Sequence, residues 1–158
     1  MIGCIIQARM GSSRLPGKTL IKLDESRSTL DFVVNQLTFS TLIDKIVIAT
    51  TNLEQDDVIE KNAKTLGIDC FRGSSDDVLD RYYHCAKKFQ INTIVRITSD
   101  CPLIDPQIVD AVIRKYQQED YDYVTNTLSR SYPIGTDVEI FSFEILEKTW
   151  QKAILPSE

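Results

Sequence analysis

The chain has 158 residues, of which 42% are hydrophobic and 26% charged, and its formal net charge at pH 7 is −5. This length and apolar content predict a single domain over residues 1–158 and exclude an intrinsically disordered chain. No apolar run reaches the roughly 20 residues of a membrane span, and the acidic balance argues against a nucleic-acid binder, which needs clustered Lys and Arg.

Apolar runs of strand length alternate along the chain with amphipathic segments of helix length. The predicted strands cover residues 2–8, 45–50, 68–71, 93–98, 121–125 and 138–141. The predicted helices cover residues 30–39, 52–66, 74–89, 105–116 and 143–150. This alternation is typical of an α/β fold, and we expect a three-layer α/β/α, Rossmann-like architecture with a mostly parallel sheet.

Helix-start signals accompany three of the amphipathic segments. Asn52 with Gln55, and Ser74 with Asp77, have the spacing of a capping box ahead of an apolar stripe. Asp105 precedes a proline, which is favoured in the first turn of a helix. We therefore expect Asn52, Ser74 and Asp105 to cap their helices.

The four cysteines are scattered, without a Cys-x-x-Cys pair: Cys4, Cys70, Cys85 and Cys101. An even count is compatible with disulfides, but three of these residues lie in or beside apolar segments. We interpret them as buried free thiols, which are typical of a cytoplasmic protein.

Polar clusters follow the first four predicted strands, in segments 9–14, 51–52, 72–75 and 99–102. The carboxyl ends of parallel strands meet at one edge of a sheet, and ligands bind there at the topological switch point. We therefore expect these four loops to converge on a single site.

The first loop, residues 9–18, reads Arg-Met-Gly-Ser-Ser-Arg-Leu-Pro-Gly-Lys. Its small residues would let the backbone approach a polyphosphate, and its three cations would neutralise charge on a departing pyrophosphate. It is not a Walker A loop, because five residues instead of four separate Gly11 from Gly17. The simpler alternative, an exposed basic turn, fits poorly with so much Gly, Ser and Arg at a strand end in an acidic protein.

Residues 5–18 resemble the amino-terminal signature of the cytidylyltransferases that activate acidic sugars, the CMP-sialic acid and CMP-Kdo synthetases, and above all the branch of spore coat polysaccharide biosynthesis protein F. The likeness continues through residues 72–81, 96–105 and 132–141. The resemblance implies a nucleotide-diphosphosugar transferase fold. It also implies Mg²⁺-dependent transfer of CMP from CTP to a sugar acid, with release of pyrophosphate, for cell-surface or spore-coat polysaccharide synthesis.

Carried over residue by residue, the resemblance assigns the first loop to the nucleotide. Lys18, Arg14 and Arg9 would be catalytic, because displacement at phosphorus needs alignment and charge stabilisation more than a strong base. The nucleotide-binding positions would be Ala8, Arg9, Met10, Gly11, Ser12, Ser13, Lys18, Arg72, Gly73 and Ser74. Among these, Arg72 and Gly73 would line the base pocket, and Ser74 has helix capping as a structural alternative.

Asp100 is the predicted metal ligand, because it directly follows a buried strand and Pro102 restricts the turn after it. Mg²⁺ is usually held by one or two carboxylates together with phosphate oxygens. Asp137 would complete the metal site, and Glu139 should lie on the same face of its strand. This pair could instead orient a sugar or guard a strand edge against aggregation.

Two further residues leave their roles open. Arg96 lies within a buried strand and needs a partner there, which is either an internal carboxylate or the substrate. His84 is the single histidine, in mid-helix, so we assign it no catalysis.

The sugar is the part of the reaction that the sequence leaves open. Arg130 is available for the carboxylate of a sugar acid, and the resemblance also implies a homodimer. Members of the family are longer, so we expect this chain to be shortened at its C-terminal end, with an incomplete acceptor half. The alternatives are transfer of another nucleotide or to another acceptor, and a nucleotide-binding module without turnover.

Overall fold

The computed structural model describes residues 1–12 and 14–153. This part of the chain forms one six-stranded sheet in the order β3-β2-β1-β4-β6-β5. The strands are β1 (Ile2–Gln7), β2 (Lys45–Thr51), β3 (Asp69–Gly73), β4 (Thr93–Thr98), β5 (Tyr123–Thr125) and β6 (Glu139–Ser142). The first four strands are parallel, and β6 runs antiparallel to both β4 and β5. The predicted, mostly parallel sheet is confirmed.

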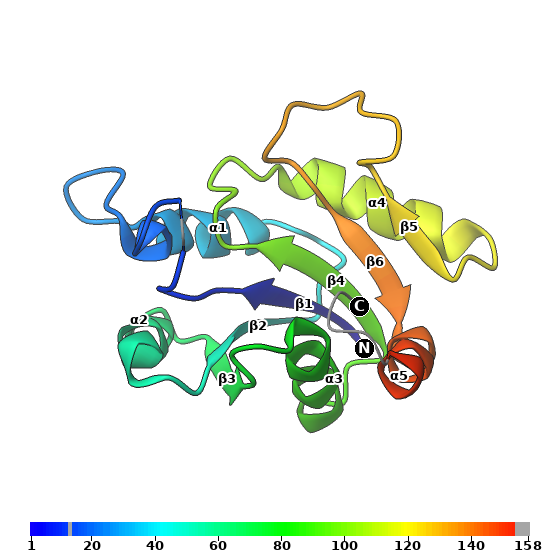
Figure 1. Ribbon diagram of the computed structural model, residues 1–158. Coiled ribbons are helices and arrows are strands. Elements are labelled where there is room, and N and C mark those ends of the chain that lie inside the picture. The colour runs from blue at the N-terminus through cyan, green and yellow to red at the C-terminus, as the bar shows by residue number, and fades with distance from the viewer. Residues whose placement is uncertain (13, 154–158) are drawn as a thin grey trace.

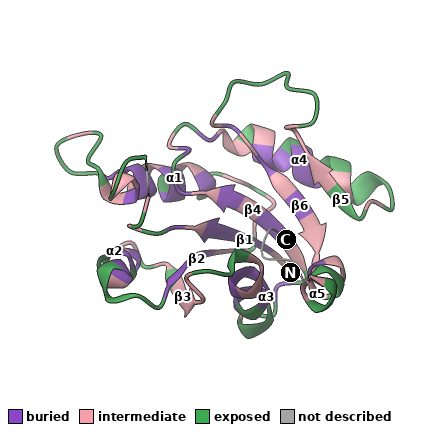
Figure 2. Ribbon diagram, viewed as in Figure 1, coloured by how far each residue is buried: buried purple, intermediate pink, exposed green. Residues whose placement is uncertain are grey.

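Helices cover both faces of this sheet (Figure 1). They are α1 (Thr29–Leu37), α2 (Asp57–Thr65), α3 (Val78–Lys88), α4 (Pro106–Gln118) and α5 (Phe143–Lys152). One core cluster joins α1, α2 and α4 to the sheet, and a second joins α3 and α5 to its other face. Buried residues accordingly concentrate in the strands and on the inner sides of the helices (Figure 2). The predicted three-layer α/β/α architecture is confirmed.

Of the three predicted helix caps, only Asp105 is confirmed; its side chain accepts a 2.7 Å hydrogen bond from the backbone N–H of Gln107. The cap at Asn52 is wrong, because a short 3₁₀ turn, η2 (Glu54–Asp56), precedes α2. The backbone N–H of Asn52 instead donates to the carbonyl of Gly73 and continues the pairing of β2 with β3.

The cap at Ser74 is also wrong. The N-cap of α3 is Asp77, whose side chain accepts a 2.8 Å hydrogen bond from the backbone N–H of Asp80. The Ser74 hydroxyl accepts from the backbone N–H of Asp77 and stabilises the turn before the helix. The capping-box spacing therefore marked the right segment but the wrong residue.

The four cysteines are all free thiols, as predicted, and three of them are buried. Burial raises the pKa of the Cys85 thiol to about 12 and that of Cys70 to about 11, so neither is a thiolate near neutral pH. Within the described residues, no helix is both long and apolar enough to cross a membrane.

Candidate active site

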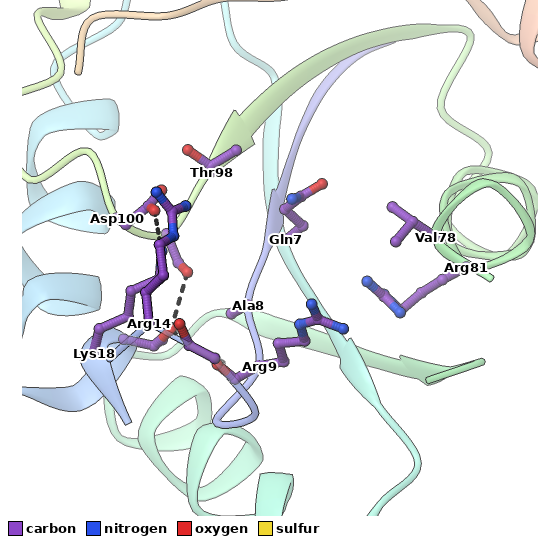
Figure 3. A pocket seen from close by; sticks show the side chains of 12 residues that line it. Gln7, Ala8, Arg9, Arg14, Lys18, Val78, Arg81, Thr98 and Asp100 are labelled. Atoms are coloured by element: carbon purple, nitrogen blue, oxygen red, sulfur yellow. Dashed lines mark hydrogen bonds and ion pairs between the residues drawn. The ribbon is translucent and has the colours of Figure 1, made fainter. Parts of the chain in front are cut away.

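A pocket of about 280 Å³ lies at the carboxyl ends of β1 and β4, the edge that the polar loops predicted (Figure 3). The first and fourth predicted loops and the strand ends before them line it, through Ala8, Arg9, Ser12, Arg14 and Lys18 and through Thr98, Ser99 and Asp100. The segments 51–52 and 72–75 do not line it. Their place is taken by α3, which contributes Val78 and Arg81 to the wall. The convergence of loops is therefore confirmed for two of the four.

The first loop folds back on the carbonyl oxygen of Met10, which accepts 2.9 Å hydrogen bonds from the backbone N–H groups of Ser12 and Gly17. Gly17 has φ of 72°, a left-handed conformation that glycine adopts without steric strain. This turn leads the chain directly into a 3₁₀ turn, η1 (Lys18–Leu20), so that Lys18 faces the pocket. Ser13, a predicted nucleotide-binding residue, lies outside the described residues.

Asp56 holds this loop in place through hydrogen bonds. Its side chain is fully buried and accepts a 2.7 Å hydrogen bond from the backbone N–H of Met10 and another from the hydroxyl of Thr51. Because a buried carboxylate needs such partners, Asp56 ties the loop after β1 to the start of α2. The sequence reasoning missed this residue, since the misplaced cap at Asn52 left it as an ordinary residue of the first helical turn.

Lys18 and Asp100, predicted as a catalytic cation and a metal ligand, form an ion pair at the mouth of the pocket. Partial burial opposes ionisation of Asp100, but hydrogen bonds from Lys18 and Thr98 outweigh it and lower the pKa of this carboxyl. The pair joins the first loop to the end of β4. The structure thus brings together the two residues on which the predicted chemistry depends most.

Asp100 has the position that a magnesium ligand needs, since its side chain is 39% exposed and lines the same pocket as the first loop. No group of three or more His, Cys, Asp or Glu side chains suited to a metal occurs among the described residues. One carboxylate fits Mg²⁺ when phosphate oxygens complete the shell.

Asp137, the predicted second ligand, pairs instead with Arg130, the predicted sugar contact. Two nitrogens of the Arg130 guanidinium donate to the two carboxylate oxygens at 2.9 and 3.2 Å. Neither residue lines the pocket. The structure gives each of them a partner that the sequence did not predict.

Arg96 has an internal carboxylate partner, one of the two alternatives that the sequence left open. It pairs with Glu139 of the adjacent strand β6, so this carboxylate is held by a neighbouring cation. Its Nε and Nη2 atoms also donate to the Oε1 atom of Gln7, at 3.3 and 3.2 Å. Because a guanidinium can only donate, the Gln7 amide turns its oxygen toward Arg96. Gln7 lines the pocket, and its amide orientation is therefore set by Arg96.

Arg72 does not reach the pocket, contrary to the prediction that it lines the base site. Its guanidinium donates to the carboxylates of Asp57 and Glu60 and to the carbonyls of Thr51 and Leu53. These contacts tie β3 to the start of α2. Hydrogen bonds to the carboxylates raise the pKa of Arg72, which is a structural cation in this arrangement.

Arg81 occupies the pocket wall instead. It lies on the inner side of α3 with 2% of its surface exposed, and its Nη1 donates to the carbonyl oxygen of Ser74. In the sequence it is a helix residue next to Asp80, so no local sequence pattern predicted that Arg81 binds a ligand. Gly73, predicted for the base site, packs against it: a Cβ at Gly73 would lie 3.1 Å from the Cγ of Arg81.

The charged side chains of the pocket are mostly cations. Arg9, Arg14, Lys18 and Arg81 line it, against the single carboxylate of Asp100. Excess positive charge in a recess with low-dielectric walls attracts anions, and arginine in particular suits phosphate. The pocket is therefore built for an anionic ligand in an otherwise acidic protein.

A family model described as cytidylyltransferase matches residues 3–156. This chain belongs to the cytidylyltransferase family. A solved cytidylyltransferase from Leptospira borgpetersenii is 41% identical to it, superposes with a TM-score of 0.93, and is covered over 66% of its length by 99% of this chain. The fold that the resemblance implied is thereby confirmed.

Two curated proteins are also similar to this chain. The spore coat polysaccharide biosynthesis protein SpsF of Bacillus subtilis is 38% identical over 148 residues, 90% of this chain and 59% of that protein. The 3-deoxy-manno-octulosonate cytidylyltransferase 2 of Hydrogenovibrio crunogenus is 30% identical over 140 residues, 87% of this chain and 55% of that enzyme. The chain thus spans less than two thirds of the length of these curated relatives.

Proposed function

We propose that this cytidylyltransferase transfers CMP from CTP to a sugar acid, with release of pyrophosphate, for the synthesis of a cell-surface or spore-coat polysaccharide. The observation that carries the proposal is the Lys18–Asp100 pair at the mouth of a cationic pocket. The names of the two curated relatives, a spore coat polysaccharide protein and a cytidylyltransferase for a sugar acid, support the choice of acceptor class. Four free thiols support a cytoplasmic setting.

The loop residues would bind and align the triphosphate. Arg9 and Arg14 are exposed at the pocket, where a guanidinium can contact phosphate oxygens in pairs. Lys18 presents a compact charge that would stabilise the negative charge developing on the departing pyrophosphate. Its ion pair with Asp100 holds the ammonium group at the pocket mouth before the nucleotide enters. These groups supply alignment and electrostatic stabilisation, which displacement at phosphorus chiefly requires.

Asp100 would hold Mg²⁺ together with phosphate oxygens of the nucleotide. Such an ion neutralises phosphate charge and orients the reacting group. The Asp100 side chain is suited to this part because it is partly exposed and its pKa is lowered, so it is ionised at neutral pH.

The reaction is tested by measuring pyrophosphate release with CTP, ATP, GTP and UTP, each with and without Mg²⁺, across a panel of acidic sugars. We expect release with CTP, only in the presence of Mg²⁺, and only with some of the sugars. Equal release from all four nucleotides would contradict the proposal. Tight CTP binding without turnover on any sugar would indicate the alternative, a nucleotide-binding module.

The role of Lys18 is tested by Lys18→Ala. Loss of a charge that acts mainly in the transition state should lower turnover by about 10²–10³-fold while the affinity for CTP changes much less. Lys115→Ala is the matched control, because Lys115 lies on the exposed side of α4 and pairs with Glu119. Equal losses of turnover and CTP affinity in Lys18→Ala would contradict a transition-state role.

A further inference from the structure

Arg81 is a buried cation that has no carboxylate partner in the part of the chain that the structure describes. Only 2% of its surface is exposed, yet no ion pair within 4 Å involves it among the described residues. Its Nη1 donates to one carbonyl oxygen, and its Nε is buried without a hydrogen-bond partner in that part of the chain. Buried arginines are almost always paired, because an isolated buried charge is strongly unfavourable.

A second cation lies beside it. Arg81 and Arg9 both line the pocket, and Figure 3 shows their guanidinium groups facing each other, one from α3 and one from the first loop. Burial lowers the pKa of Arg81, and the charge of Arg9 acts in the same direction, while Tyr82, Asp56 and Asp77 act against it. Two like charges at close range repel each other, and an anion placed between them would remove the repulsion.

The neighbouring strand leaves room for this arrangement. Gly73 ends β3, and a Cβ at this position would approach the Cγ of Arg81 to 3.1 Å and the ring of Phe71 to 2.7 Å. Contacts this short would force a side chain to move. The glycine thus lets the Arg81 side chain pass along the end of β3 toward the pocket.

We propose that Arg81 and Arg9 form a two-arginine clamp that holds a diphosphate group, and that this group is the counter-charge that Arg81 lacks among the described residues. Guanidinium groups bind phosphate oxygens in pairs, so the two can share one diphosphate. Identification of the diphosphate as part of a nucleotide rests on the proposed function. The clamp itself rests on the burial and the unpaired nitrogen of Arg81. When occupied, it links α3 to the first loop.

The clamp has a consequence that a purely structural arginine would not have. Replacing Arg81 by methionine keeps an unbranched apolar stem and removes the guanidinium group with its unpaired buried charge. The free protein should then unfold at the same temperature or a higher one, whereas affinity for the diphosphate should fall. A structural arginine would show the reverse, a loss of stability without a loss of anion affinity.

The experiment measures thermal unfolding and, by calorimetry, the binding of CTP, CMP and inorganic pyrophosphate to the wild-type protein and to Arg81→Met. We expect Arg81→Met to bind CTP and pyrophosphate at least tenfold more weakly and to bind CMP within about threefold of the wild type, with no loss of thermal stability. Arg9→Met should show the same selective loss. Arg114→Met is the control, because this arginine lies exposed on α4, and it should bind all three ligands normally.

Several results would overturn the proposal. If the Arg81→Met variant bound pyrophosphate as tightly as the wild type does, Arg81 would contact another part of the ligand or would not contact the ligand at all. Failure of Arg81→Met to fold would contradict the unpaired-charge argument. Arg81→Lys then tests the clamp, since lysine keeps the charge but loses the paired contacts, and undiminished pyrophosphate affinity in that variant would overturn it.

The binding measurements with different ligands also test the clamp separately from the proposed function. Arg81-dependent binding of pyrophosphate but not of CTP would assign the clamp to a free diphosphate and contradict the nucleotide reaction. Transfer of CMP by a protein whose pyrophosphate affinity does not depend on Arg81 would support the reaction and overturn the clamp.

Discussion

The carboxylate of Asp56 accepts a 2.7 Å hydrogen bond from the backbone N–H of Met10, across 46 residues of sequence. The same carboxylate accepts a hydrogen bond from the hydroxyl of Thr51 at the end of β2. The loop that carries Arg9, Arg14 and Lys18 is therefore held by a buried residue that does not itself line the pocket. The position of the loop therefore depends on a contact between the segment that follows β1 and the segment that follows β2.

Asp56→Ala should weaken both stability and nucleotide binding. The substitution leaves the Met10 N–H without a partner, which costs about 1–3 kcal/mol, and it frees the first loop. We expect the affinity for CTP, measured by calorimetry, to fall about tenfold, since ordering a loose loop opposes binding. Asp56→Asn should recover part of both losses, because an amide oxygen can still accept from Met10.

Thr51→Val is the matched control for this prediction. It removes the other hydrogen bond to Asp56 and keeps the one to Met10. Its stability, measured by urea unfolding, should fall by about 1 kcal/mol, while CTP affinity stays within about twofold of the wild type. If Thr51→Val weakened CTP binding as much as Asp56→Ala, the loop-anchoring role of Asp56 would be wrong.

Glu139→Gln should reduce stability without changing magnesium-dependent CTP binding. Glu139 pairs with Arg96 and does not line the pocket, so its loss leaves a half-buried cation with the Gln7 amide and the Tyr82 ring but without its carboxylate partner. We expect a loss of about 1–3 kcal/mol in urea unfolding. CTP affinity in the presence of Mg²⁺ should stay within about twofold of the wild type.

Glu119→Gln is the control for Glu139, because Glu119 is exposed and, among the described residues, its partners are Lys115 on α4 and Tyr121 just after it. Its effect on stability should be well below 1 kcal/mol, as is usual for surface ion pairs. A tenfold loss of magnesium-dependent CTP affinity in Glu139→Gln would instead make Glu139 a metal or substrate ligand.

Asp110 should contribute stability that acid removes. It is buried on α4, and its carboxylate accepts hydrogen bonds from Ser40 and Thr41. Burial raises the pKa of Asp110, but these hydrogen bonds and the charge of Arg114 outweigh it, so the pKa in the folded state is below the ordinary 3.8. The contribution is therefore fully present above about pH 3.8 and is lost as the pH falls through the folded-state pKa.

Asp110→Asn tests this dependence. We expect it to lower the free energy of unfolding by about 1–3 kcal/mol at pH 7, and the difference from the wild type to shrink at pH 3 and below. Asp120→Asn, at an exposed position after α4, is the control and should have little effect at either pH. A difference that did not change with pH would mean that Asp110 acts through neutral hydrogen bonding alone.

The elements of the fold could be predicted from local pattern. Apolar runs and amphipathic stripes located every strand and α-helix of the described residues to within about five positions, because burial on one face imposes a period on the sequence. Helix starts were less predictable: the box spacings at Asn52 and Ser74 were satisfied, yet neither residue is the N-cap. Capping depends on where the chain turns, and a 3₁₀ turn or a strand extension moved that point.

The candidate site could be predicted only in part. Arg9 and Lys18 of the first loop, and Asp100 after β4, line the pocket where the strand order and the family resemblance had placed them. The resemblance placed Arg72 at the base site, but two carboxylates on α2 bind it outside the pocket. Local sequence does not reveal such competition between a ligand site and a nearby opposite charge.

The sequence by itself determined the alternation of strands and helices, the edge of the sheet that carries the site, and the family. Only the tertiary structure decided which charges remain for a ligand. Asp137 and Arg130 neutralise each other, as do Glu139 and Arg96, whereas Arg81 enters the pocket without a carboxylate partner among the described residues. The physical reason is that periodicity records burial along one element, while the pairing of a charge depends on distant segments that folding brings within a few ångströms.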